Sequence, residues 1–419
     1  MRSDPLPGAK AHIETARARA ALIDDIPADT PLKPIARVGV LGAGTMGGGI
    51  AMNFLTAGIP VTIVEAEQAN LDRGVATITR NYANSVKRGK LSDAEAAAAM
   101  ALLTPSLAFD DLGGADLVIE AVYENMDLKQ EIFAKLDTIA KPGAILASNT
   151  SYLNVDEIAA VTARPEAVCG MHFFSPANVM KLLEVVRGAK TGASELATVM
   201  ALAPKINKIA VVSGVCPGFI GNRMLTPRQQ QAQALLMEGA AYNDVDDVLH
   251  EFGFPMGPFQ MGDLAGNDVG WHRDPARVET IREALCAVGR FGQKAGKGWY
   301  DYDENRQRTV SDETLRIVSE FAARQDKPQR TIGKDEIRDR LLYPMIAEGA
   351  KILDEGMAQR SGDIDTVWLN GYGWPAWTGG PMHWAEHEGL AKIVAGLDTY
   401  GLEASPYLRR KADAGEGFG

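Results

Sequence analysis

The segment that most constrains this chain is a glycine-rich turn between a short apolar run and a helical stretch. Gly42-Ala-Gly-Thr-Met-Gly47 directly follows Val38–Leu41, and the helical pattern after it ends at Ala57-Gly58. In such a turn the first glycine permits the bend, the second lets a pyrophosphate approach the backbone, and the third lets the helix pack on the strand. Amides at the helix N-terminus then face the phosphates. The segment predicts a dinucleotide site, and a glycine-rich loop that binds nothing is the simpler alternative.

This turn lies inside a longer stretch that carries no charge. No side chain from Val38 to Val64 is charged, and the stretch is long enough to span a bilayer. Its glycines and Ile59-Pro60 divide it into short pieces, whereas a membrane helix is continuous. We therefore expect no membrane span.

Short apolar runs alternate with helical patterns through the first half of the chain. The runs are Val38–Leu41, Val61–Val64, Leu117–Val122, Ala144–Ala147, Ala167–Met171 and Ile209–Val212. This alternation predicts a parallel sheet covered by helices on both faces, in a domain of residues 35–214. Residues 1–34 are Ala-rich and charged and end in a proline-containing stretch, which predicts a short helix and an extended linker outside the core.

Beyond residue 214 the patterning is helical, without strand alternation, and it contains a duplication. Asp244-Val-Asp-Asp-Val and the later Gly257-Pro258 recur as Asp363-Ile-Asp-Thr-Val and Gly380-Pro381. A Glu-Gly pair precedes each copy. The sequence predicts two tandem copies of one helical unit, in residues 215–330 and 331–419.

Composition excludes several classes of function. The chain has 43 basic and 54 acidic residues and a net charge of −11, which argues against nucleic acid as the main partner. Its three cysteines, Cys169, Cys216 and Cys286, form no Cys-x-x-Cys pair, so neither a disulfide framework nor a thiolate zinc site is indicated. The first residues contain Glu14 and Arg17, which leave no room for the apolar segment of a secretory signal. We expect a cytoplasmic protein.

An acidic residue at the end of the second predicted strand selects the dinucleotide. Glu65 ends Val61-Thr-Ile-Val-Glu, where a carboxylate can accept hydrogen bonds from both ribose hydroxyls of the adenosine half. The same carboxylate would repel a 2′-phosphate. The sequence therefore favours NAD over NADP, although Glu65 could also be a surface charge at a strand end.

Four further segments resemble a known family when they are taken together with the glycine-rich turn. They are Ser148-Asn-Thr-Ser151, Gly170-Met-His172-Phe-Phe-Ser-Pro, Met180-Lys-Leu-Leu-Glu184-Val-Val and Pro217-Gly-Phe-Ile-Gly-Asn222-Arg. These motifs and their spacing resemble the L-3-hydroxyacyl-CoA dehydrogenase family, from about residue 35 to the C-terminus. The duplicated helical half resembles the dehydrogenase portion of bifunctional and multifunctional β-oxidation enzymes. The resemblance implies an α/β Rossmann-type NAD-binding domain followed by an all-α region of two tandem helical repeats.

The resemblance also implies a catalytic role for each of four residues. Oxidation of a secondary alcohol needs a base that works near neutral pH, and His172 is the candidate. Glu184 would fix the imidazole tautomer and stabilise the imidazolium. Ser151 and Asn222 would hold substrate oxygens. The simpler alternatives are an ion pair of Glu184 with Lys181 or Arg187, a helix-start position for Asn222, and a cap by Ser151 on the helix near Val155–Ala160.

The cofactor contacts that the resemblance implies extend beyond the turn. Besides Gly42, Gly44, Thr45, Met46, Gly47 and Glu65, they involve Glu124, Lys129, Ser151, Ser175 and Lys294. The alternative for the two lysines is ordinary solvation. Ser175 departs from the single-function enzymes of the family, which often carry Asn there. Its shorter side chain either loses a direct contact with the nicotinamide or reaches it through water.

The substrate would be an acyl-CoA thioester, whose phosphates need a local basic cluster in an acidic protein. Lys87, Arg88 and Lys90, at the end of a predicted long helix, are candidates, and a solvated helix end is the alternative. His383 and His387 are four residues apart on a possible helix but have no third ligand in the sequence, so we predict no metal site.

The sequence predicts NAD-dependent oxidation of (S)-3-hydroxyacyl-CoA to 3-oxoacyl-CoA. A dehydrogenase of another hydroxy acid and a non-catalytic NAD(H)-binding protein are the rival hypotheses. Residues 1–34 resemble the linker that follows the hydratase in bifunctional relatives and are too few for a hydratase domain, so we expect no hydratase activity. If the second helical repeat packs on the first as a built-in partner, the chain is monomeric, with a homodimer as the alternative.

Overall fold

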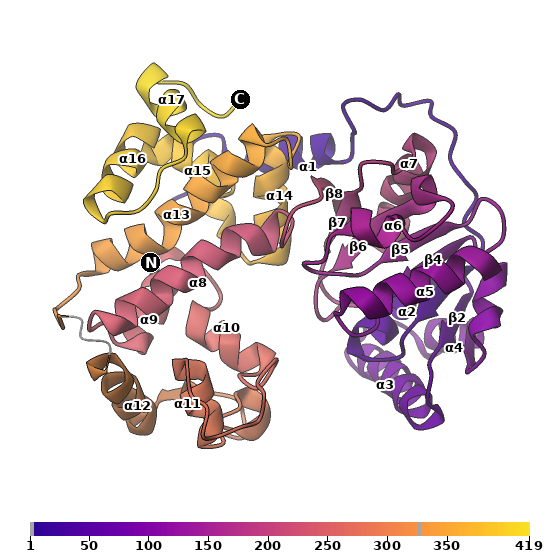
Figure 1. Cartoon of the computed structure of the whole chain (residues 1–419), viewed down its shortest axis with the longest axis horizontal. Helices are drawn as coiled ribbons and strands as arrows, with labels where there is room; N and C mark the ends of the chain where they lie inside the picture. Colours follow the sequence, from indigo (N-terminus) through magenta and orange to yellow (C-terminus); the bar gives the residue numbers. More distant parts are fainter. Residues whose placement is uncertain (1–3, 325–327) are drawn as a thin grey trace.

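The computed structural model describes residues 4–324 and 328–419, which form a sheet domain and a helical region beside it (Figure 1). The sheet has eight strands in the order β3-β2-β1-β4-β5-β6-β7-β8. They are β1 (Val38–Leu41), β2 (Val61–Val64), β3 (Leu103–Ser106), β4 (Leu117–Glu120), β5 (Ile145–Ser148), β6 (Val168–Phe173), β7 (Leu182–Arg187) and β8 (Ile209–Gly214). Its helices are α2 (Thr45–Thr56), α3 (Gln68–Lys87), α4 (Asp93–Ala101), α5 (Met126–Ile139), α6 (Val155–Ala159) and α7 (Ala193–Leu202).

The sheet confirms the predicted strand-and-helix alternation but is not wholly parallel. β7 was not predicted, and it pairs with β6 in the antiparallel direction. Only residues 174–181 join the two strands, whereas a parallel neighbour needs a crossover of about a dozen residues or more. β3 was missed as well, because this edge strand contains Pro105 and only one large apolar residue, Leu103.

The helical region contains α8 to α17 and one short hairpin. The helices are α8 (Gly221–Met237), α9 (Tyr242–Phe252), α10 (Pro258–Ala265), α11 (Ile281–Ala287), α12 (Asp312–Ala323), α13 (Lys334–Asp354), α14 (Ser361–Gly371), α15 (Pro381–Glu388), α16 (Leu390–Thr399) and α17 (Pro406–Ala414). β9 (Tyr300–Tyr302) and β10 (Arg308–Val310) pair in the antiparallel direction. The expectation of a region without strands was therefore wrong, because segments this short give no alternation that a sequence pattern can detect.

The segment before the sheet domain crosses the molecule. α1 (Ala9–Ala20) lies against α14 in the helical region, and an extended chain then returns to the sheet domain (Figure 1). The helix and the linker were predicted, but their place outside the core was wrong. Ala20 is buried in the core of the helical region, and Ile23 is buried in that of the sheet domain. The small alanines of α1 permit this close packing: Ala16 faces Gly362, where an added Cβ would lie 3.0 Å away.

The two segments that the sequence pairs have the same local structure. Asp246 on α9 accepts hydrogen bonds from the backbone N–H groups of Phe259 and Gln260 in the first turn of α10. Asp365 on α14 accepts one from Met382 in the first turn of α15. Each aspartate side chain thus accepts hydrogen bonds from backbone N–H groups that a helix N-terminus leaves unpaired.

A buried carboxyl in α14 makes stability depend on pH. Asp363 is 1% exposed, and Nε of Arg360 lies 3.4 Å from its carboxylate. Burial, partly offset by the charge of Arg360, raises the pKa of Asp363 from 3.8 to about 6. A carboxyl whose folded pKa is raised stabilises the fold below its unfolded pKa and loses this contribution as the pH rises through its folded pKa.

Asp363→Asn should therefore raise the melting temperature more at about pH 8 than at about pH 5. The rise in the pKa of Asp363 corresponds to about 3 kcal/mol of unfolding free energy at the higher pH. Asp363→Asn gains this free energy because it removes the buried charge. Asp312→Asn, which removes an exposed carboxyl from the first turn of α12, controls for the helix dipole. An equal gain at both pH values, measured by thermal unfolding, would contradict the role of burial.

Candidate active site

A histidine and a glutamate face each other across the β6–β7 hairpin. The register pairs His172 of β6 with Glu184 of β7, and Nδ1 of the imidazole lies 2.7 Å from Oε2 of the carboxylate. His172 is 4% exposed and Glu184 is fully buried. A buried carboxylate can only accept, so Nδ1 carries the proton and Nε2 is left as the basic nitrogen. The twelve-residue spacing is the spacing of two facing positions in this hairpin.

Glu184 also joins the sheet domain to the start of α8. Its Oε1 accepts hydrogen bonds from the backbone N–H groups of Ile220, at 3.1 Å, and Gly221, at 2.9 Å. Both carboxylate oxygens are therefore occupied, which fixes the orientation of the group. The alternative ion pair with Lys181 or Arg187 is not formed, since Arg187 binds Asp25 instead.

Asn222 enters the same neighbourhood from the second position of α8. Its Oδ1 accepts a hydrogen bond of 2.8 Å from the phenol of Tyr372, which follows α14. The rings of Phe174 and Phe219 lie 4.5 and 5.7 Å from the imidazole of His172. The imidazole thus contacts two aromatic rings, one of which belongs to the loop just before the helix that carries Asn222.

Ser151 lies on the loop that follows β5, and the carboxylate of Glu124 holds this loop. Oε1 of Glu124 accepts hydrogen bonds from Oγ1 of Thr150, at 2.6 Å, and from the backbone N–H of Ser151, at 2.8 Å. Burial opposes the charge of Glu124, but these bonds and the charge of Lys129 lower its pKa below the ordinary value. The alternative role of Ser151 as a helix cap was wrong, because Asn154 caps α6.

Lys129 contacts the glutamate that holds this loop. Its side chain is 1% exposed, and its ammonium lies 2.7 Å from Oε1 of Glu120 and 3.4 Å from Oε2 of Glu124. Ser148 also donates to Glu120. The described residues thus give Lys129 an internal ion pair that orients Glu124. The solvated alternative was wrong for this lysine.

The glycine-rich turn has the geometry that a dinucleotide requires. Gly42 has a φ of 101°, and a Cβ there would lie 2.7 Å from the carbonyl oxygen of Ala121. A Cβ at Gly44 would meet no atom within 4 Å, which leaves room above the start of α2 for a phosphate. Glu65 accepts the backbone N–H of Ala43 at 2.9 Å, so its carboxylate lies beside the turn.

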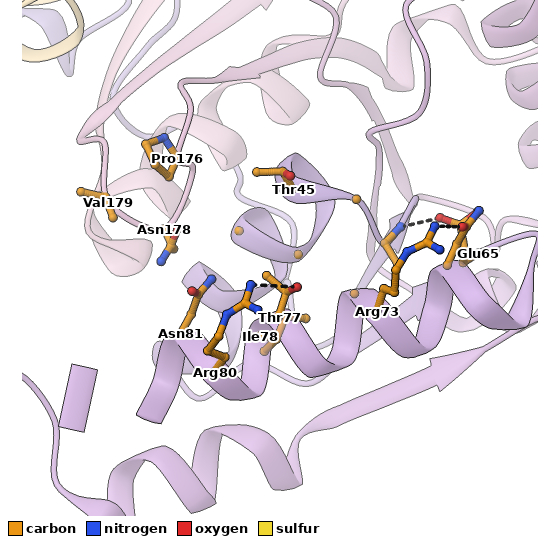
Figure 2. Close-up of a pocket in the computed structure, with 16 residues that line it drawn as sticks. Thr45, Glu65, Arg73, Thr77, Ile78, Arg80, Asn81, Pro176, Asn178 and Val179 are labelled. Carbon is orange, nitrogen blue, oxygen red and sulfur yellow. Dashed lines mark hydrogen bonds between the residues drawn. The ribbon is translucent and has the colours of Figure 1, made fainter. Parts of the chain in front are cut away.

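A cavity of about 710 Å³ opens between the turn, α3 and the loop after β6 (Figure 2). Thr45 and Glu65 line it together with residues that sequence reasoning missed, among them Arg73, Arg80 and Asn178. The two arginines are seven residues apart on α3, a spacing that places them on one helix face. This seven-residue spacing is the signal in the sequence that could have identified the two arginines as cavity residues. The cavity fits a ligand with phosphate groups at the open side of the turn.

Comparisons with known proteins agree with this geometry. The family model described as 3-hydroxyacyl-CoA dehydrogenase, NAD binding domain, matches residues 37–216, and the C-terminal domain model of the same family matches residues 218–302. The dehydrogenase part of multifunctional enzyme 1 from C. elegans is 30% identical, with a TM-score of 0.69 and coverage of 97% of each chain. The chain belongs to the 3-hydroxyacyl-CoA dehydrogenase family.

Two other relatives define the similarity further. The human peroxisomal bifunctional enzyme is 44% identical over 91% of this chain and 57% of the relative. The 3-hydroxybutyryl-CoA dehydrogenase of Escherichia coli K12 is 27% identical, with a TM-score of 0.77 and coverage of 91% of this chain and 99% of the other. This dehydrogenase-family chain thus spans little more than half the length of the first curated relatives it matches.

Family membership assigns the glycine-rich turn to an NAD-binding domain, as predicted. Gly42, Gly44, Thr45, Met46 and Gly47 form the turn and the start of α2. The open space at Gly44 and the carboxylate of Glu65 fit the pyrophosphate and ribose of NAD. The remaining contacts predicted for this family stay predictions at the level of single residues.

Other predicted residues of this dehydrogenase-family site are spread over the structure. Ser175 is exposed on the loop after β6. Lys294 belongs to the helical region, where its ammonium lies 2.5 Å from Asp268. Lys87 and Arg88 are exposed at the end of α3, and Lys90 lines a separate cavity of about 260 Å³. Within residues 4–324 and 328–419, no helix is long and apolar enough to cross a membrane.

Glu65→Ser should weaken the preference for NAD over NADP by at least about fivefold. Removing one negative charge beside a 2′-phosphate removes a repulsion of about 1 kcal/mol or more at contact distance. The ratio of kcat/KM for the two dinucleotides measures the effect. Glu67→Ser, at the exposed N-cap of α3, is the matched control. An unchanged ratio would place the ribose elsewhere than beside Glu65.

Proposed function

We propose that this chain oxidises (S)-3-hydroxyacyl-CoA to 3-oxoacyl-CoA with NAD as the oxidant. The observation that carries the proposal is the 2.7 Å contact between His172 and Glu184, placed where β6 ends in an NAD-binding domain. Ligands of open α/β sheets bind at the carboxyl ends of the strands, so this pair lies where a substrate would meet the nicotinamide. Relatives named for dehydrogenation of 3-hydroxybutyryl-CoA support the substrate class.

His172 acts as the general base in this proposal. Nε2 accepts the proton of the C3 hydroxyl, while bound NAD supplies the acceptor for the hydride that leaves C3. The Nδ1 proton stays hydrogen-bonded to Glu184, whose charge stabilises the imidazolium that forms. The phenyl rings of Phe174 and Phe219 limit the access of water to the base.

Ser151 and Asn222 position the substrate oxygens. Ser151 lies on the loop whose backbone Glu124 holds, and Asn222 is fixed at the start of α8. A hydroxyl and an amide can each donate to the C3 oxygen or the thioester carbonyl, and these contacts strengthen as the C3 oxygen gains negative character. Because one residue comes from each domain, the substrate is held at their junction.

The coenzyme A phosphates require positive charge near this junction. Lys87, Arg88 and Lys90 remain our proposed contacts for them. Arg80 lies nearer the start of the same helix, facing the large cavity beside Asn178 (Figure 2). A row of cations along α3 suits an anionic ligand that extends from the sheet edge toward the helix end.

The acyl chain needs an apolar space that starts near Asn222. A cavity of about 600 Å³ lies beside α8, lined by Thr226, Phe259 and Trp299 among others. Thr226 is one helical turn beyond Asn222 on the same face of the helix. We propose this cavity as the space for the tail of longer thioesters.

The test is NADH formation with (S)-3-hydroxyacyl-CoA esters from four carbons upward, in parallel with NADP and with the matching free acids. Turnover of the thioesters with NAD, and not of the free acids, is the expected result. Full activity on a free hydroxy acid would favour a dehydrogenase of another substrate. NADH binding without turnover of any thioester would contradict the proposal, and rejection of all longer esters would contradict the proposed acyl space.

We also propose that α8–α12 and α13–α17 are two copies of one helical unit, and that the chain is a monomer. The matching roles of Asp246 and Asp365 support the first proposal. The long packing contact of α13 with α8 supports the second, because it buries a face that a single copy would offer to a partner. A dimer-sized mass in dilute solution would contradict the second proposal.

A cytoplasmic location also stays a proposal, which cell fractionation tests.

A further inference from the structure

One side chain of the second half of the helical region reaches the catalytic neighbourhood. Tyr372 follows α14, 150 residues after Asn222, and its phenol donates a hydrogen bond of 2.8 Å to Oδ1 of Asn222. Its ring lies edge-on to Phe174 at 5.5 Å, and Phe174 in turn contacts His172. Tyr372 thus contacts the amide of Asn222 directly and is separated from His172 by one side chain, Phe174.

Packing leaves the phenol of Tyr372 little freedom. The ring stacks on Trp368 with a centroid distance of 4.4 Å and an interplanar angle of 27°. On another side it contacts Gly221, where any Cβ would overlap the ring. The glycine at the start of α8 therefore makes the space that Tyr372 fills, beside the residue to which it donates.

The phenol is a fixed donor. Burial, followed by the negative charge of Glu184, raises the pKa of Tyr372 well above its ordinary value, so the group keeps its proton. With Oδ1 of Asn222 taken by this donor, the amide Nδ2 is the group left to face the substrate. Within the described residues, no hydrogen bond of Nδ2 competes for it.

We propose that Tyr372 is a positioning residue of the dehydrogenase, which fixes the Asn222 amide so that its N–H group points at a substrate oxygen. The second half of the helical region therefore completes the active site as well as packing on the first half. This inference rests on the proposed function, because it needs a substrate oxygen for Asn222 to bind.

Tyr372→Phe tests the inference by removing the hydroxyl alone. Without the donor, the amide of Asn222 can flip and present its oxygen to the substrate oxygen. One hydrogen bond of this kind predicts a loss of about tenfold in kcat/KM for (S)-3-hydroxybutyryl-CoA. The KM for NAD and the dissociation constant of NADH should stay unchanged, since neither depends on Asn222.

The matched control is Tyr343→Phe. Tyr343 is a buried tyrosine of α13, and its phenol donates to Glu388 rather than to any site residue. This variant should keep wild-type kinetics. If it lost as much activity as Tyr372→Phe, the effect would come from packing in the helical region.

A double-mutant cycle with Asn222→Ala separates positioning from a merely structural role. If Tyr372 acts through Asn222, Tyr372→Phe should cost nothing further once the amide is gone. A second tenfold loss in that background, or no loss in the single variant, would overturn the inference. If the wild-type chain shows no turnover, the proposed function and this inference are both overturned. If the wild-type chain is active and Tyr372→Phe has the same kinetics, the inference alone is overturned.

Discussion

His172→Asn should lower kcat by about 10²–10⁴-fold while leaving NADH binding intact, because it removes the only proposed proton acceptor of the reaction. Asparagine keeps a polar side chain of smaller size on β6, but it cannot take a proton near neutral pH. The imidazole lies on the strand end and not in the glycine-rich turn, so the dinucleotide keeps its contacts. Initial rates with (S)-3-hydroxybutyryl-CoA and NADH titration by fluorescence measure the two effects.

His250→Asn is the matched control for the loss of an imidazole. His250 lies on α9, where its ring contacts Gln260 and the backbone of Phe254. This variant should alter stability more than kcat. Retention of most of the wild-type kcat by His172→Asn would mean that another group, or water, removes the hydroxyl proton.

Glu184→Gln has the second largest expected effect, again about 10²–10⁴-fold in kcat. The amide is nearly the same size but carries no charge, so it cannot stabilise an imidazolium on His172. It also presents N–H to one of the groups that now donate to the carboxylate: Nδ1 of His172 or the amides of Ile220 and Gly221. The kcat of Glu184→Gln should therefore decrease even though the variant folds.

Two comparisons make this prediction specific. Glu195→Gln removes another buried carboxylate of the sheet domain, one that pairs with Lys33, and should leave kcat nearly unchanged. The double variant of His172 and Glu184 should be no slower than His172→Asn alone, because residues that act as a unit are not additive. Additive losses in the double variant would show that Glu184 acts independently of His172.

The sequence predicted the parts of the fold that are recorded in local patterns. Val38–Leu41 and the glycine-rich turn predicted the first strand and the helix that follows it. β7 was hidden because its apolar run was interpreted only as the surroundings of Glu184. The burial of α1 could not be predicted, since its partner α14 lies more than 300 residues away in the chain.

The candidate site shows the same division. The motifs that contain His172, Glu184, Ser151 and Asn222 were visible in the sequence, and the His172–Glu184 contact joins two of them directly. Tyr372 was invisible in this role, because nothing near it in the sequence points to Asn222. The internal pairing of Lys129 was hidden in the same way: an ammonium with two carboxylate neighbours is indistinguishable in sequence from a solvated one.

Transfer of deuterium from C3 of the substrate tests the central claim most directly. The chain would be incubated with NAD and (S)-3-hydroxybutyryl-CoA that carries deuterium at C3, and the dinucleotide would be analysed by mass spectrometry. The account predicts one deuterium in each NADH formed, with the 3-oxo thioester as the other product. NADH without deuterium, or no NADH from an enzyme that still binds it, would contradict the account.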